Sequence, residues 1–232
     1  MSSAMDTAAP WGTSGAFLIA KWLPRDETTV TIAQRIDALL SEVSGELGTG
    51  EWVASNGAPW EGDLAALVAA HAVVDDLGDP DPAYGYTMTL IGTSPTMRLT
   101  VRVMAGARVA GRRAPNNRLT IEINELTPGA FSTRVADLVT EAVVTAWQPT
   151  AVAFRNDDLI DVAARGGWSI PVGYRTWVAD SVGNVTSTAT QITARRLEHG
   201  TFLSAPDAWT ADDAASAMLA TLQGNSLDKI PH

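Results

Sequence analysis

The chain of 232 residues contains no cysteine. This absence excludes disulfides, thiolate catalysis and zinc sites with cysteine ligands, and it suits the reducing cytosol. Lysine is scarce as well, because Lys21 and Lys229 are the only two. The three histidines, His71, His199 and His232, are not placed at metal-ligand spacing on one element. The sequence therefore predicts no histidine metal site and no cofactor.

Several signals of other protein classes are also missing. No stretch approaches the roughly 18 apolar residues of a membrane span. Residues 1–15 lack the basic start and apolar run of a secretion signal, so we expect a cytoplasmic protein that does not enter a membrane. We find no G-x-S-x-G elbow, no glycine-rich phosphate loop and no dinucleotide fingerprint. The sequence therefore predicts that the chain is not an enzyme.

The charge is strongly acidic and unevenly distributed, with a net value of −10. Residues 36–97 contain ten carboxylates and no lysine or arginine: Asp37, Glu42, Glu46, Glu51, Glu61, Asp63, Asp75, Asp76, Asp79 and Asp81. Residues 98–118 contain six arginines and no acid: Arg98, Arg102, Arg108, Arg112, Arg113 and Arg118. The overall sign disfavours nucleic acid as the ligand and favours a basic protein partner. The alternative is that the acidity serves only solubility.

Hydrophobic periodicity predicts helices and short strands in mixed order. The helices are expected at residues 29–48, 64–74, 132–148, 157–164 and 211–222. The strands are expected at residues 16–21, 84–91, 96–104, 119–123, 150–154, 174–179, 190–197 and 201–203. In the strand at 96–104, alternation places Arg98 and Arg102 on the solvent face. In the helix expected at residues 29–48, Thr31 and Gln34 resemble a capping pair near the start, and Gly48 marks the end.

The order of elements predicts an α+β fold, a mainly antiparallel sheet packed with about four helices. We expect one domain over residues 15–222, with a flexible N-terminal tail at 1–14 and a C-terminal tail at 223–232. The expected core residues have helical or alternating spacing: Ile36, Leu39, Val43, Ile121, Leu138, Val139, Val143 and Phe154.

Two groups of carboxylates resemble metal sites. The turn from Asp75 to Asp81 could bind a hard cation, but it lacks the spacing and closing glutamate of a calcium loop, so an acidic surface turn is the alternative. Glu122-x-Asn124-Glu125 resembles the acids of metal-dependent nucleases. The lysine that such motifs usually need is missing, so ordinary solvent-facing strand residues are the alternative reading.

Eight tryptophans occur among only fifteen aromatic residues. Trp147 and Trp177 lie in strong elements and are expected in the core. Trp52 and Trp60 lie beside carboxylates in an irregular segment, an arrangement typical of a protein-binding hot spot, although they could instead be lids over the core. The predicted partner-binding residues are Glu51, Trp52, Trp60, Glu61, Asp63, Asp75, Asp76, Asp79 and Asp81. The competing surface is the arginine-rich loop at residues 108–118.

Five short motifs follow one another along the chain. They are Trp22 with Pro24-Arg25, Glu51-Trp52, Asn117-Arg118-Leu119-Thr120-Ile121, Ala146-Trp147-Gln148-Pro149, and Pro171-x-Gly173-Tyr174-x-x-Trp177. With a terminal Ala/Leu helix, this order resembles the immunity protein 52 family of bacterial polymorphic toxin systems over residues 15–222.

The resemblance implies a cytoplasmic immunity protein that binds and neutralises a cognate toxin with a basic, nuclease-type domain. Such a role has no catalytic residues to transfer and needs no nucleic acid or membrane partner. One alternative is a metal-dependent hydrolase or nuclease that uses Glu122, Glu125 and the acids at 75–81. Another is a non-catalytic regulatory module that binds some other cytosolic protein.

Overall fold

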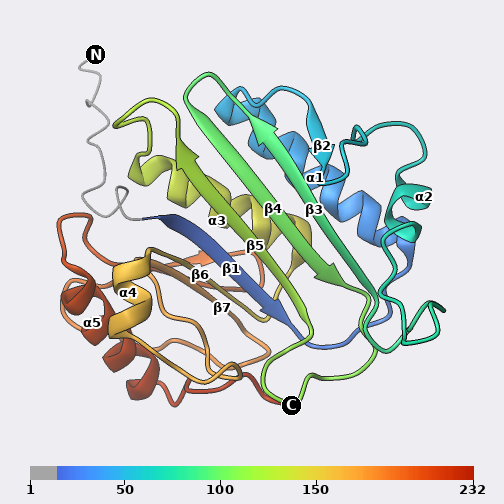
Figure 1. Ribbon diagram of the computed structural model, residues 1–232. Helices are drawn as coiled ribbons and strands as arrows, with labels where there is room; N and C mark the ends of the chain where they lie inside the picture. The colour runs from blue at the N-terminus through green and yellow to red at the C-terminus, as the bar shows by residue number, and fades with distance from the viewer. Residues whose placement is uncertain (1–14) are drawn as a thin grey trace.

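One antiparallel sheet is the centre of the structure, a computed structural model that describes residues 15–232 (Figure 1). Within this range the sheet has nine strands in the order β2-β3-β4-β5-β1-β6-β7-β9-β8. The strands are β1 (Ala16–Trp22), β2 (Trp52–Ala54), β3 (Tyr86–Thr93), β4 (Met97–Ala105), β5 (Asn117–Glu125), β6 (Ala151–Arg155), β7 (Arg175–Ala179), β8 (Thr193–Leu197) and β9 (Gly200–Ser204). The predicted α+β fold is confirmed. The tail expected at 1–14 lies outside the described residues.

Five helices accompany the sheet within residues 15–232. They are α1 (Thr29–Leu47), α2 (Leu64–Ala69), α3 (Thr133–Trp147), α4 (Asp157–Val162) and α5 (Ala211–Gly224). Helix α1 begins after Thr28, whose side chain forms a capping box with Thr31, so the capping pair lies three residues earlier than expected. Gly48 ends the helix in the left-handed conformation, as the sequence predicts.

The two halves of the sheet are covered differently. Strands β4 and β5 alternate between buried and more exposed residues, whereas β6, β7 and β9 are buried almost throughout. Alternation indicates one covered face, and continuous burial indicates two. Figure 1 shows the cause: α1 and α3 lie behind the sheet, and α4 and α5 lie in front of its β6–β7 end. We call the viewer-side face of β3, β4, β5 and β1 the open face.

The predicted core residues are buried, except that Leu138 is partly buried and packs against the core. Trp147 and Trp177 are also in the core. The last ten residues differ from the expected tail. Leu227 and Ile230 are 3% and 0% exposed, and the Ile230 N–H donates to the carbonyl of Trp168 at 2.9 Å. The C-terminal segment is therefore part of the packed body.

Two local differences arise at the outer edge of β3. Strand β2, in a segment expected to be irregular, pairs with Leu90–Gly92 of β3. Helix α2 ends at Ala69 rather than near residue 74, because the chain beyond it joins the sheet edge. The Thr87 N–H donates to the His71 carbonyl, and Ala72 forms a bridge with Tyr86. These tertiary contacts override the local helical periodicity.

The C-terminus of α3 is held by two arginines from another part of the chain. Arg25 donates to the carbonyls of Trp147 and Gln148, at 2.8 and 3.1 Å, and Arg35 donates to the Trp147 carbonyl at 2.7 Å. Arg25 also pairs with Glu27 at 2.7 Å, and the Glu27 side chain is only 2% exposed. Glu27 in turn accepts the Gly106 N–H at 3.0 Å. This cluster joins α1, α3 and the chain beyond β4.

We expect Arg25→Ala to lower the free energy of unfolding by about 3 kcal/mol, because it leaves a buried carboxylate without its cation and α3 without two donors. Arg134→Ala is the matched control, since Arg134 is 75% exposed in its pair with Glu46 and its loss should cost less than about 1 kcal/mol. Urea denaturation of both variants makes the comparison. Equal losses in the two variants would contradict the role given to Arg25.

Candidate functional site

The predicted acidic residues lie along one edge of the sheet. Residues 51–85 follow the outer edge of β3, where β2 pairs with it and the Ser55 N–H donates to the Thr89 carbonyl at 2.9 Å. Further along the edge the Val73 N–H donates to the Gly85 carbonyl at 2.8 Å. The structure thus brings the carboxylates of this segment to one side of the molecule.

Residues 73–84, which we call the acidic loop, form a small hydrogen-bonded hairpin. The Asp81 N–H donates to the Val73 carbonyl at 2.7 Å, and the Asp75 N–H donates to the Asp79 carbonyl at 2.8 Å. The Oδ1 atom of Asp75 accepts the N–H groups of Leu77 and Asp79 at 2.8 and 3.0 Å. These bonds fix the shape of the hairpin without help from a partner.

The acidic loop exposes apolar side chains between its carboxylates. Leu77 at the tip is 87% exposed, and Val74 and Tyr84 are 55% and 53% exposed. Asp76 and Asp79 are exposed beside them. Sequence reasoning named the carboxylates but missed these apolar residues. The available signal was a leucine within an aspartate-rich turn, a place where no core is within reach.

The tryptophans predicted as anchors do not lie on this surface. Trp52 is 7% exposed and its Nε1–H donates to Ser44 Oγ at 2.8 Å, so its prediction as an anchor is corrected. Trp60 is half-buried against the core, with its Nε1–H 3.3 Å from Asp37 Oδ1. Both indoles pack toward α1 because apolar area is better stabilised there than in water.

The remaining predicted residues of the segment are exposed. Glu51 and Glu61 are at the surface on either side of Trp52 and Trp60. Asp63 is also exposed, and its side chain caps α2 by accepting the Ala66 N–H at 3.0 Å. The segment therefore contributes charge at the β3 edge, whereas exposed apolar area comes from the acidic loop.

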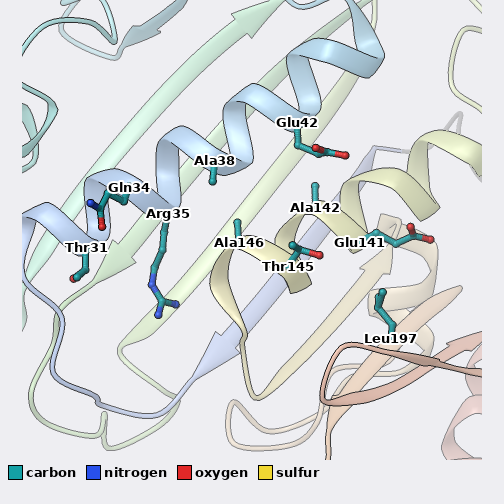
Figure 2. A pocket seen from close by; sticks show the side chains of 10 residues that line it. All are labelled: Thr31, Gln34, Arg35, Ala38, Glu42, Glu141, Ala142, Thr145, Ala146 and Leu197. Atoms are coloured by element: carbon teal, nitrogen blue, oxygen red, sulfur yellow. The ribbon is translucent and has the colours of Figure 1, made fainter.

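A groove lies between α1 and α3 (Figure 2). The groove has a volume of about 580 Å³, and alanines of both helices line it, Ala38 from α1 and Ala142 and Ala146 from α3. Two of its charged residues already have partners, since Arg35 donates to the Trp147 carbonyl and Glu141 pairs with Arg195. The groove therefore offers small apolar side chains together with the polar side chains of Gln34, Glu42 and Thr145.

The competing arginine surface begins next to the acidic loop. Arg108 and Asp81 line the same depression of about 210 Å³, together with Glu27 and Tyr86. Arg112 and Arg113 are exposed further along residues 108–118. The two surfaces proposed as rivals from the sequence are therefore neighbours at this end of the sheet.

The residues of the hydrolase alternative are dispersed. Glu122 is exposed on the open face, whereas the carboxylate of Glu125 accepts the N–H groups of Gly129 and Phe131 at 3.1 and 2.5 Å. The acids at 75–81 lie at the β3 edge. Across residues 15–232, no three His, Asp or Glu side chains are grouped so that they could hold one metal ion.

Comparison with known proteins gives a likeness of fold. Neither a protein-family model nor a curated protein matches the sequence. Among solved structures, the Pseudomonas aeruginosa T6SS protein PA0821 superposes with a TM-score of 0.53 at 10% identity. The match covers 93% of this chain and 76% of that one. Among the described helices, none is both long enough and apolar enough to span a membrane.

The C-terminal end of the central strand β1 holds a buried lysine. Lys21, 8% exposed, donates from Nζ to the Gly167 carbonyl at 2.7 Å. Burial, with smaller contributions from the positive charges of Arg155, Arg118 and Arg165, lowers the pKa of Lys21 to about 8. Burial also raises the pKa of Tyr174 to about 12, with a smaller contribution from Asp158.

We expect the free energy of unfolding to rise as the pH increases from about 8 to 10, and Lys21→Met to abolish this rise. In that window the folded state releases the Lys21 proton while the unfolded chain still binds it, so deprotonation favours folding. Tyr174 acts in the opposite direction only above pH 10, where the unfolded chain ionises first. Urea denaturation at half-unit pH steps measures the slope. An equal slope in both proteins would refute the assignment to Lys21.

Proposed function

We propose that this chain is a non-catalytic immunity protein that binds a basic, nuclease-type bacterial toxin in the cytoplasm and neutralises it. The acidic loop is the contact surface in this proposal. The observation that carries it is Leu77, which is 87% exposed at the tip of a hairpin between Asp76 and Asp79. An apolar side chain held out between carboxylates suits a partner that is apolar at one point and basic around it.

The stiffness of the acidic loop supports a binding role. The carboxylates of Asp75 and Asp81 accept hydrogen bonds from N–H groups of the loop itself, at 2.8 to 3.0 Å. Asp76 and Asp79 remain at the surface to face a partner. A loop that is already ordered loses little conformational entropy when it binds, so more of the contact energy contributes to affinity.

Electrostatics explain how the partner would approach. The ten carboxylates of residues 36–97 belong to the same segment as the acidic loop, and a field of one sign speeds encounter with an oppositely charged protein. A nuclease has a basic cleft for its substrate, so an acidic protein could cover or compete for that cleft. This is inhibition by surface complementarity and requires no chemistry.

Two further observations favour a toxin system over an unrelated regulatory role. The motif order resembles the immunity protein 52 family, and the protein of similar fold bears the name of a type VI secretion system. The likeness concerns fold at 10% identity, so the partner is proposed from the surface and not from the neighbour.

The proposal predicts that a nuclease-type toxin domain is encoded beside this chain's gene and that variants of the acidic loop change the association and dissociation rates with that domain differently. Leu77→Ser should raise the dissociation rate about tenfold, because a buried leucine contributes roughly 1.5–3 kcal/mol. The double variant Asp76→Lys, Asp79→Lys should slow association about tenfold at low salt and little at high salt. Surface plasmon resonance at two salt concentrations separates the two rates.

Leu126→Ser is the matched control, since Leu126 is 53% exposed in a loop distant in sequence from residues 73–84. Its kinetics should equal those of the unmodified chain. If Leu126→Ser weakens the complex as much as Leu77→Ser, or if only variants of Arg108, Arg112 and Arg113 weaken it, the acidic loop is not the contact surface.

We also expect no turnover of DNA, RNA or phosphate esters when Mg²⁺ or Mn²⁺ is added. The reason is the placement of the acids, since Glu125 is bound to its own loop and Glu122 lies on a different part of the sheet from residues 75–81. A divalent-dependent nuclease activity that Glu122→Gln removes would favour the hydrolase alternative.

A further inference from the structure

The open face of the sheet carries a group of cations. Arg98 and Arg102 project from β4 at positions i and i+4 of one strand, and the register places Arg102 beside Thr120 and Arg118 beside the buried Lys21. Side chains at this spacing lie about 13 Å apart on the same face. Arg155 of β6 pairs in register with Phe17 of β1, so the group continues past the border of the open face and lies on four adjacent strands, β4, β5, β1 and β6.

These cations are not neutralised by the protein itself. In the described part of the chain, Arg98, Arg102 and Arg118 form no ion pair, and all three are exposed. The Nε–H of Arg155 is buried without a hydrogen-bond partner. Two carboxylates lie close to them: Glu122, which the strand register places opposite Thr100 and Phe17, and Asp157, which lines the same hollow as Arg102.

This positive face is unexpected on a chain of net charge −10. Several arginines elsewhere on the surface are paired with carboxylates, as in Arg195 with Glu141 and Arg196 with Asp180. The arginines of the open face remain available instead. Because neither folding nor solubility of an acidic protein requires a cluster of one sign, its charge is best explained by a ligand of the opposite sign.

We propose that the open face is a second docking surface and that its occupant is an acidic polypeptide segment. The arginines are interspersed with threonine hydroxyls, Thr89, Thr100 and Thr120, and with the half-buried apolar side chains Ile91 and Met104. Guanidinium groups bind carboxylates through paired hydrogen bonds, and the hydroxyls and apolar groups suit peptide backbone and side chains.

A nucleic acid fits this surface less well. Single strands bind where bases can stack on aromatic faces, and the aromatic ring on this face, Phe17, is covered by the Arg155 guanidinium at 5.1 Å from its centroid. A second copy of this chain is the other acidic candidate, and oligomeric state distinguishes it.

Fluorescence anisotropy on the full chain tests the proposal with two labelled probes, a deca-glutamate peptide and a deca-thymidine oligonucleotide. At low salt we expect the peptide to bind more tightly than the oligonucleotide. Arg98→Ser with Arg102→Ser should weaken peptide binding about tenfold, the sum of two exposed ion contacts. Added salt should weaken binding to the unmodified chain.

The control removes the same charge elsewhere. Arg134→Ser with Arg195→Ser, in α3 and β8, should leave peptide affinity unchanged. The proposal is overturned if the control pair weakens the peptide as much as the Arg98 and Arg102 pair does, or if the oligonucleotide binds more tightly. It is also overturned if sedimentation at low salt shows self-association that the Arg98 and Arg102 variant loses, since the occupant is then a second copy. Each variant is first shown to unfold at the same urea concentration as the unmodified chain.

Discussion

The carbonyl groups at the end of α3 set a constraint that the arrangement of the helices satisfies. A helix ends with carbonyls that have no partner within it, and here they lie at Trp147, which is buried against the ring of Trp22 at 4.9 Å. Arg25 and Arg35 supply the missing donors. Because Arg25 precedes α1 and Arg35 belongs to it, these bonds hold α1 beside α3, and the two helices together cover the rear of the sheet.

Several residues of the motifs that suggested a family have structural roles. Trp22, Arg25 and Trp147 contact one another at the end of α3. The Asn117 side chain accepts the N–H of Ala107 at 2.9 Å and donates to its carbonyl at 3.1 Å. Gly173 passes so close to β6 that a Cβ atom would lie 2.2 Å from the Phe154 carbonyl oxygen. These residues stabilise the fold. These five residues are distinct from the surfaces proposed to bind, so a chain can keep them and change its partner.

The sequence predicted what depends on local pattern. Alternation in residues 96–104 and 119–123 placed Arg98 and Arg102 on the solvent side correctly, because a strand with one covered face must alternate. Strand β2 was missed, since three residues carry no periodicity and β2 exists only through its pairing with β3. The fate of Trp52 and Leu77 could not be predicted, because the burial of an apolar side chain depends on which distant element reaches it. The grouping of Arg98 and Arg102 with Arg118 and Arg155 on one face could not be predicted either, because it depends on the order of the strands in the sheet.

The unequal cover of the sheet has a consequence for how this protein can change over generations. At the β6, β7 and β9 end almost every side chain is packed on both sides, so a substitution there disturbs the core. On β4 and β5 every second position faces water, and residues such as Arg98, Arg102, Arg118 and Glu122 can be exchanged without moving the backbone. Packing thus constrains substitution in one half of the molecule and leaves the exposed positions of the other half open to it. The binding surface can change while the packed scaffold stays the same.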